Sequence, residues 1–410
     1  MKTWMIVLLG SACLSAAGLP AQAEEDVFTP LAAVPFNPTT TPVPGTDGKW
    51  HFVYELEFAN TRPVPATLEE VKVVGLPAED KDGKQQRKES RTVRSLATFD
   101  PSSFPTRLNQ LNNQPAEDAT IELNSTRLFL IDLAVAQQEI PARLGHVLRL
   151  TGKGTKASNQ TPVEQSYPAA TLKVARDLPK IHPPLTGKGW VAVNGCCEPG
   201  AHRSTAVPVN GQLHYAQRFA IDWVRLDSQG RLRNGPADEV ESYTAYGAKL
   251  YAVADATVVS TLDGLPNQTP PNGPDPDTIT IDNVDGNHVV LDLGHGYYAF
   301  YAHMKPGSVR VRVGQKVRAG DVLGLLGNSG NSTAPHLHFH IMSGPSVLGS
   351  EGVPYVIDRF KFAGKIPESA LTEDMGGNFR RYLLPTSQFR TEQFRTEQFP
   401  LDLDIIDFWQ

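Results

Sequence analysis

The sequence predicts a mainly β protein made of two consecutive β-rich regions. Between residues 51 and 58 aromatic or aliphatic side chains alternate with other residues, which is typical of a strand with one face on a core and the other nearer solvent. The 410 residues include 34 glycines and 33 prolines, which favours many turns and short strands. Hydrophobic residues at 40% and charged residues at 20% exclude a disordered or membrane-embedded protein.

The chain divides into four expected segments. Residues 1–23 are expected to be a secretory signal, because Lys2 precedes a short apolar run and Ala21-Gln22-Ala23 fits the small-x-small cleavage rule. An uncleaved anchor is the alternative. Residues 24–180 are expected to form an immunoglobulin-like β-sandwich, since turn clusters separate short strand candidates. Residues 181–365 form the second β domain, and residues 366–410 a C-terminal tail. From the expected signal at residues 1–23 we infer export to the periplasm or the extracellular space. We expect no stable membrane span once the signal is cleaved.

Charge and cysteine content restrict the partners and the covalent framework. A net charge of −6 without a long basic run argues against nucleic acid as the main partner. We also expect the protein to be a monomer. Removal of the signal leaves only Cys196 and Cys197, which is not a disulfide framework. Adjacent cysteines form at most a vicinal bridge, unless one of them lies near a metal.

The stretch Pro335-His336-Leu337-His338-Phe339-His340 carries the clearest chemical signal. On a strand, its three histidines share one face, and neighbours on that face lie roughly 6.6 Å apart at about 3.3 Å rise per residue. This spacing suits one imidazole on a metal and the next acting on the water bound to that metal. An exposed polar face is the alternative, and we expect His340 to be exposed.

Two segments upstream add to this signal. Asp222 is the single carboxylate within Phe219-Ala220-Ile221-Asp222-Trp223, where burial demands a cation, strong donors or protonation. Pairing with Arg218 or Arg225 is the alternative to a metal. His303 ends another expected strand, within Tyr301-Ala302-His303. Further strands are expected at Lys249–Val259 and Val309–Val313.

These motifs, in this order, resemble the lysostaphin/LytM-type zinc endopeptidases, which have a duplicated hybrid motif fold. The resemblance rests on Tyr301-Ala302-His303, on the Val-x-x-Gly-x-x-Val-x-x-Gly pattern within 309–324, on Gly327-Asn328-Ser329-Gly330 and on His336-Leu337-His338. It covers about residues 190–355. It implies a LytM-like antiparallel half-barrel sheet, a Zn²⁺ cofactor and the peptide cross-links of peptidoglycan as substrate.

The resemblance also implies the ligands. The family holds zinc through a histidine, an aspartate and the second histidine of His-x-His. The last two of these ligands correspond here to Asp222 and His338. The family's first histidine lies four residues before the aspartate, where this chain has Arg218. His202 and His214 are the two available replacements, and we favour His202.

The same resemblance assigns two catalytic histidines. His336 would take the proton of the zinc-bound water, and His303 would hold or protonate the tetrahedral intermediate. The function expected is a secreted zinc endopeptidase that cuts cell-wall peptides. The alternative is a degenerate LytM-like domain that binds the wall or activates another hydrolase. Arg218 is the main argument for this alternative, because a cation near the metal would oppose its charge.

Overall fold

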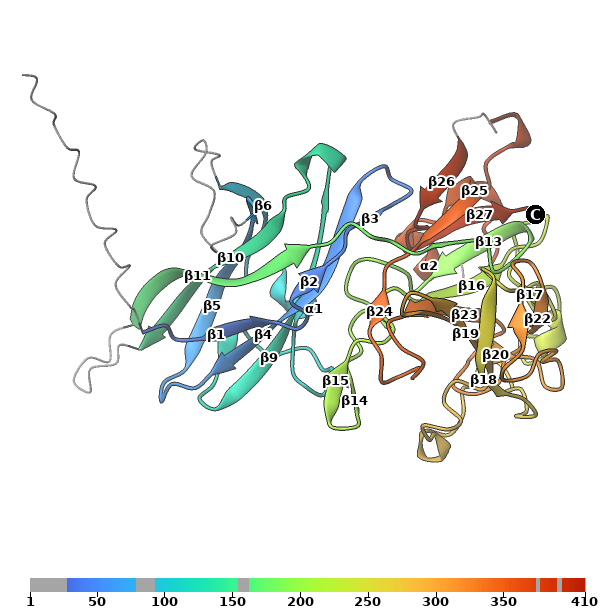
Figure 1. Cartoon of the computed structure of the whole chain (residues 1–410), viewed down its shortest axis with the longest axis horizontal. Helices are drawn as coiled ribbons and strands as arrows, with labels where there is room; N and C mark the ends of the chain where they lie inside the picture. Colours follow the sequence, from blue (N-terminus) through green and yellow to red (C-terminus); the bar gives the residue numbers. More distant parts are fainter. Residues whose placement is uncertain (1–27, 79–92, 154–161, 374–376, 389–392, 410) are drawn as a thin grey trace, which may run out of the picture.

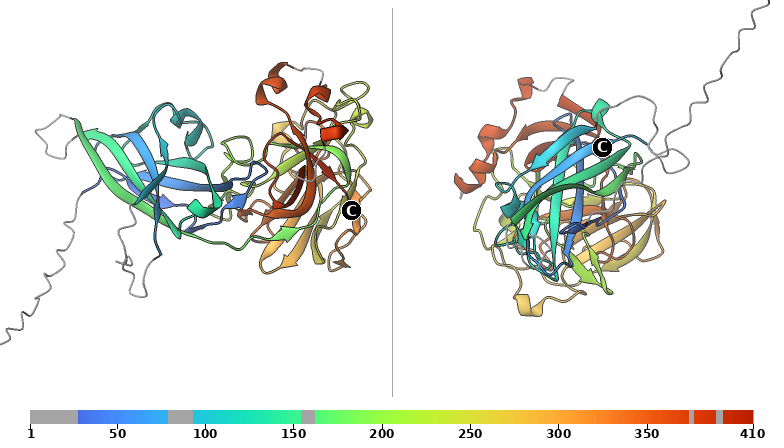
Figure 2. Two further views of the ribbon diagram at one scale, coloured as in Figure 1. Left: turned by 90° about the horizontal axis from the view of Figure 1, so that it is seen from above. Right: turned by 90° about the vertical axis from the view of Figure 1, so that its left-hand side faces the viewer.

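A computed structural model describes residues 28–78, 93–153, 162–373, 377–388 and 393–409. Within these ranges the chain forms two lobes that lie end to end, with the N-terminal lobe in blue to green and the C-terminal lobe in green to red (Figures 1 and 2). The expected signal at residues 1–23 lies outside the described residues. Among the helices of the described part, none is long and apolar enough to cross a bilayer.

The N-terminal lobe consists of two sheets that share one hydrophobic core. The first sheet contains β1 (Ala32–Pro35), β3 (Val43–Pro44), β4 (Trp50–Asn60), β7 (Leu108–Asn109) and β9 (Ser125–Val135). The second contains β2 (Thr39–Thr40), β5 (Ala66–Leu76), β6 (Arg94–Phe99), β8 (Thr120–Ile121), β10 (Arg143–Lys153) and β11 (Pro162–Val174). A short helix, α1 (Phe104–Arg107), precedes β7. The immunoglobulin-like assignment of this lobe stays a prediction.

Strand β4 is buried on both faces, which differs from the expected alternation. Phe52, Leu56 and Phe58 are fully buried in the core of the N-terminal lobe, as the pattern predicts. On the opposite face, Val53 joins the core of the C-terminal lobe and Glu55 is only 1% exposed. The second face therefore contacts the other lobe instead of water.

The C-terminal lobe is built on one large, curled half-barrel sheet. Its main path runs through β12 (Lys180–Ile181), β25 (Val356–Lys365), β27 (Asp404–Phe408), β13 (Gly187–Val193), β16 (Ile221–Arg225), β23 (Leu337–Met342), β20 (Tyr297–Met304), β19 (Asn287–Gly294), β18 (Ala256–Leu262) and β21 (Lys316–Val317). Off this path lie β24 (Gly352–Val353) and β26 (Phe394–Gln398). Two small sheets pair β14 (Val207–Val209) with β15 (Gln212–His214), and β17 (Lys249–Tyr251) with β22 (Val322–Leu325). Helix α2 (Glu368–Glu373) follows β25.

The order of the central strands brings the chemically suggestive segments together. Strand β23 lies between β16 and β20, and all of its residues are buried. In the antiparallel register Asp222 of β16 is opposite His338 of β23, and Ala302 of β20 is opposite the same histidine. Residues that are opposite each other in neighbouring strands share a face of the sheet. The sheet therefore places Asp222 and His338 side by side.

Several expected elements differ in the structure. The stretch Lys249–Val259 is divided between β17 and β18, which belong to different sheets. Residues 309–313 lie outside the strands, although Arg310 N donates to Leu323 O at 2.9 Å. The segment expected as a C-terminal tail supplies β26 and β27, and β27 is inserted between β25 and β13. The chain thus returns to the large sheet after residue 365.

A buried histidine makes the stability of the N-terminal lobe sensitive to acid. His146 of β10 is 1% exposed, and its ring contacts Tyr54 Oη at 2.9 Å and Ala170 O at 2.6 Å. Burial lowers the pKa of His146 from 6.5 to about 4. Between these pH values the unfolded chain binds the proton and the folded lobe does not, so acidification favours unfolding.

We therefore expect the protonation of His146 to lower the free energy of unfolding by about 3 kcal/mol as the pH drops from about 6.5 to about 4. Urea unfolding at a series of pH values measures this contribution. The variant His146→Gln is expected to have a shallower slope than the wild type, and His51→Gln, at the surface contact with Asp47, serves as the control. Identical slopes for all three proteins would contradict the prediction.

Candidate metal centre

The site is organised around Asp222, which is 8% exposed and lies on β16 between the buried Ile221 and Trp223. Its Oδ1 atom is 3.0 Å from Nδ1 of His338, the residue opposite it in the sheet. Its Oδ2 atom accepts a hydrogen bond of 2.8 Å from the side-chain amide of Asn194, just after β13. Strand pairing and this amide hold the carboxylate in one orientation.

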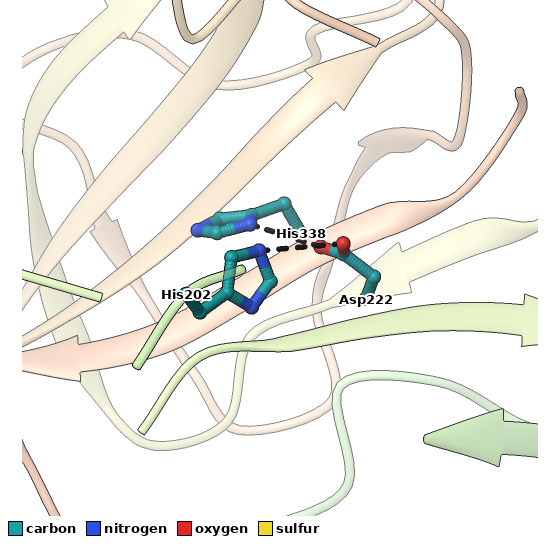
Figure 3. A group of neighbouring side chains, drawn as sticks. All are labelled: His202, Asp222 and His338. Carbon is teal, nitrogen blue, oxygen red and sulfur yellow. Dashed lines mark hydrogen bonds and ion pairs between the residues drawn. The ribbon is translucent and has the colours of Figure 1, made fainter. Parts of the chain in front are cut away.

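His202 reaches the same carboxylate from a loop. The loop joins β13 to β14, and the Nε2 atom of His202 lies 3.3 Å from Asp222 Oδ2. Nδ1 of His202 donates to the carbonyl of Asn194 at 2.9 Å, which fixes the tautomer and leaves the lone pair on Nε2. Asn194 therefore orients both Asp222 and His202. Figure 3 shows the two imidazoles converging on the carboxylate.

The three side chains form a donor set that fits a metal ion. One ligand atom from each of His202, Asp222 and His338 lies within 4.8 Å of the others. Two imidazole nitrogens and one carboxylate oxygen are the ligands that zinc takes in catalytic sites with an open fourth position. Each residue also has a second hydrogen bond that orients it, as metal ligands usually have. For His338 this bond joins Nε2 to Nδ1 of His340 at 3.0 Å.

Two further histidines border this donor set. Nε2 of His336 lies 3.3 Å from Asp222 Oδ1, and its Nδ1 donates to Ala334 O at 2.7 Å. His303 follows Ala302 on β20, and its Nδ1 donates to Ser329 O at 2.8 Å. The rings of His303 and His336 are 4.7 Å apart. Both rings therefore have their Nδ1 proton fixed on a carbonyl, and Nε2 of His336 lies against the Asp222 carboxylate.

His303 also has an unusual backbone conformation. Its φ angle is 60°, in the left-handed region that residues other than glycine rarely adopt. The hydrogen bond from its backbone N to Asp285 O, at 3.1 Å, and the ring bond to Ser329 hold it there. Backbone strain of this kind is concentrated at functional sites.

Burial and mutual charge set the protonation of the cluster. Burial opposes ionisation of Asp222, but His336 and His202 outweigh it and hold the pKa of this carboxyl well below 3.8. Burial likewise opposes the charge on His202 and His336, yet Asp222 raises the pKa of both above 6.5.

The other two rings are held neutral. Burial, reinforced by His336 and His338, puts the pKa of His303 well below 6.5. Burial also lowers the pKa of His338 to about 4. Neutral imidazole is the form that binds a metal or accepts a proton.

The structure separates the two alternatives for the first histidine. His202 lies in the cluster, whereas His214 is at the end of β15 with its Nδ1 3.2 Å from Glu351 Oε1. His340, expected to be exposed, is fully buried and contacts His338. That expectation was wrong because β23 is covered on both faces.

Neither arginine proposed as a partner of Asp222 takes that role. Arg218 donates to Glu55 Oε2 at 2.8 Å and to Glu351 Oε2 at 2.7 Å. Arg225 donates through Nε to Lys188 O at 3.0 Å. Sequence reasoning missed Glu55 and Asn194. Asn194 sits beside the adjacent cysteines but has no motif of its own, and Glu55 is one of two carboxylates on the face of its strand that the alternation places nearer solvent.

Cys196 and Cys197, in the loop before His202, are joined by a disulfide bond and are buried. This agrees with the expected vicinal bridge. Their loop also receives a hydrogen bond of 3.1 Å from Asp402 N to Cys196 O, which links it to the segment before β27.

Comparisons with known proteins find similarity within the C-terminal lobe. Residues 240–349 match the model of Peptidase family M23. Peptidoglycan DD-endopeptidase ShyA of Vibrio cholerae serotype O1 is 42% identical over 57 residues, which are 14% of this chain and 13% of that protein. Glycyl-glycine endopeptidase ALE-1 of Staphylococcus capitis is 41% identical over 59 residues, which are 14% of this chain and 16% of that protein. This chain thus matches less than a fifth of the length of either relative.

Among solved structures, a zinc-containing peptidase from Vibrio cholerae is 12% identical, with 74% of this chain and 82% of that chain covered and a TM-score of 0.25. Within the family match, residues 240–349 contain His303, His336 and His338, while His202 and Asp222 precede it. Residues 240–349 are therefore similar to Peptidase family M23.

Proposed function

We propose that this chain is an exported, zinc-dependent endopeptidase that hydrolyses peptide bonds of bacterial cell-wall peptidoglycan. The observation that carries the proposal is the convergence of His202 and His338 on the buried Asp222, with His336 and His303 beside them. Matched segments of relatives named as a peptidoglycan endopeptidase and a glycyl-glycine endopeptidase support the substrate class. The expected signal at residues 1–23 supports a periplasmic or extracellular location.

His202, Asp222 and His338 are the residues that would hold the zinc ion. Bound there, zinc would supply a Lewis acid that polarises the scissile carbonyl and a lowered pKa for water at the open position. The hydrogen bonds from His202 Nδ1 to Asn194 O and from Asn194 to Asp222 keep two of the three donors aimed at the same point. The donor set is thus arranged before any ion binds.

The two remaining histidines would move protons. His336 presents Nε2 beside Asp222 and is placed to take the proton of the attacking water. His303 presents a neutral Nε2, because its Nδ1 proton is fixed on Ser329 O. Its ring centroid is 4.7 Å from that of His336, so a proton that His336 takes from the water can pass to His303, which would hold or protonate the tetrahedral intermediate and so supply the leaving amine.

The contacts of Arg218 favour an active enzyme over an inactive wall-binding domain. Its guanidinium is buried and makes hydrogen bonds to Glu55, Glu351 and Gly352 O. Two carboxylates therefore neutralise this cation, and the charge conflict expected from the sequence does not apply.

The ligand assignment is tested by zinc content. We expect His202→Ala to lose bound zinc and peptidoglycan hydrolysis, because one of three protein ligands is gone. The loss should exceed the roughly 10–100-fold that is typical when only a hydrogen-bond partner of a ligand is changed. His214→Ala is the matched control and should keep both properties, since His214 pairs with Glu351. Elemental analysis and muropeptide release, with and without chelator, provide the measurements. Full zinc occupancy in His202→Ala would overturn the assignment.

The role of His303 is tested separately from metal binding. We expect His303→Ala to retain zinc and to lower kcat by about 10²–10⁴-fold, the usual contribution of a positioned acid or base. The exposed His295 in the β19–β20 turn has a φ of 55°, so His295→Asn is a control that tolerates this conformation. Hydrolysis by His303→Ala at the rate of the His295→Asn protein would exclude a proton-transfer role.

A further inference from the structure

A buried carboxylate of the N-terminal lobe lies against the loop that carries His202. Glu55 on β4 is 1% exposed and faces the C-terminal lobe. It accepts hydrogen bonds from Arg218 at 2.8–3.2 Å and a short bond from Nη1 of Arg203. Burial opposes its ionisation, but Arg218 and Arg203 outweigh burial and lower the pKa of Glu55 below 4.5. Glu55 is therefore a fixed negative charge between the lobes.

Arg203 is the residue directly after His202, and its guanidinium is almost entirely bound by the N-terminal lobe. Besides the bond to Glu55, its Nη2 atom donates to Tyr54 O at 2.8 Å and to Ile131 O at 3.3 Å. Three acceptors on the neighbouring strands β4 and β9 therefore hold this single side chain. Since Arg203 and His202 share a peptide bond, the position of one restricts the position of the other.

A second contact fixes the same loop three residues further on. The side chain of Asn113 donates to Ala206 O and accepts from Ala206 N, both at 2.8 Å. Ala206 also packs with Leu128 and Leu130 of β9. The N-terminal lobe therefore holds the loop at residues 203 and 206.

The loop has no strand partner of its own near His202. Residues 194–206 contain no strand, and the contacts on their other side come from Asp402, which accepts from Gly195 N at 2.9 Å. His202 lies between this anchor in its own lobe and the anchors in the other lobe. Between these two sets of anchors, His202 Nε2 lies 3.3 Å from Asp222 Oδ2.

We propose that the N-terminal lobe is a structural part of the metal centre. Glu55 and Arg203 are positioning residues that hold His202 within reach of Asp222, so the affinity for zinc depends on contacts between the lobes. The inference rests on the proposed zinc site, and it assigns the N-terminal lobe a role in building that site.

The test removes the contact to the loop without leaving a buried carboxylate unpaired. In Arg203→Met, Glu55 keeps its bonds to Arg218. We expect Zn²⁺ affinity, measured on the full chain by competition with a chromogenic chelator, to fall about 10–100-fold, as for other groups that orient a ligand. Arg231→Met is the matched control: it also removes an arginine ion pair of the C-terminal lobe, to Asp227 at 2.7 Å, and should bind zinc as the wild type does.

A double-mutant cycle shows whether Arg203 acts through His202. In a His202→Ala background, Arg203→Met should weaken the residual zinc affinity, measured at higher Zn²⁺ concentrations, by much less than it weakens the affinity of the wild type, because the ligand that it positions is absent. An equal loss in both backgrounds would mean that Arg203 affects the protein by another route and would overturn the inference.

A second variant keeps the proposal testable if Arg203→Met does not fold, as judged by near-UV circular dichroism. Asn113→Gly removes both bonds to Ala206 and suits the φ of 66° at this position. It should weaken zinc binding in the same direction. Tight zinc binding by the wild type together with unchanged affinity in the folded variants overturns this inference alone. Absence of zinc binding in the wild type overturns the proposed function as well.

Discussion

The site depends on keeping one buried carboxylate ionised. Asp222 lies within an apolar strand, and burial of an unpaired carboxylate is costly. The nearest arginines in the sequence, Arg218 and Arg225, bind elsewhere. The charge of Asp222 is instead balanced by an amide and by surrounding imidazoles. A divalent ion meets the same requirement, since it replaces the protons of those imidazoles as the positive partner. The imidazoles that surround the charge of Asp222 thus include the two that could serve as metal donors.

The part of the site that lies on paired strands could be predicted from the sequence. Alternation in His336-Leu337-His338 places both imidazoles on one face, and antiparallel pairing brings Asp222 opposite His338. The first histidine is different. Residues 202 and 214 both precede Asp222, and neither lies on a strand that pairs with β16 or β23, so the periodicity of the sheet does not choose between them. Contacts between segments more than 140 residues apart, such as Arg203 to Glu55, have no periodic signal in one sequence.

The periodicity of the sequence does not predict the burial of Glu55. An alternating strand predicts that polar residues face water, and this holds only when the second face is not covered. Strand β4 lies in the interface, so Val53 enters the core of the C-terminal lobe and Glu55 faces two arginines. A charged residue in such a strand fits the pattern of an exposed face equally well. Only the partner charges, which come from a distant segment, distinguish the two cases.

Charge balance explains how arginine can stand four residues before Asp222. Glu55 and Glu351 provide two negative charges, and Arg203 and Arg218 provide two positive charges, in one hydrogen-bonded group. Both arginines form their ion pairs within this group, so neither neutralises Asp222. Loss of Glu55 would leave two cations and one anion beside the site. The buried arginine at position 218 and the carboxylate of the other lobe are thus mutually dependent, because each buried charge is balanced by the other.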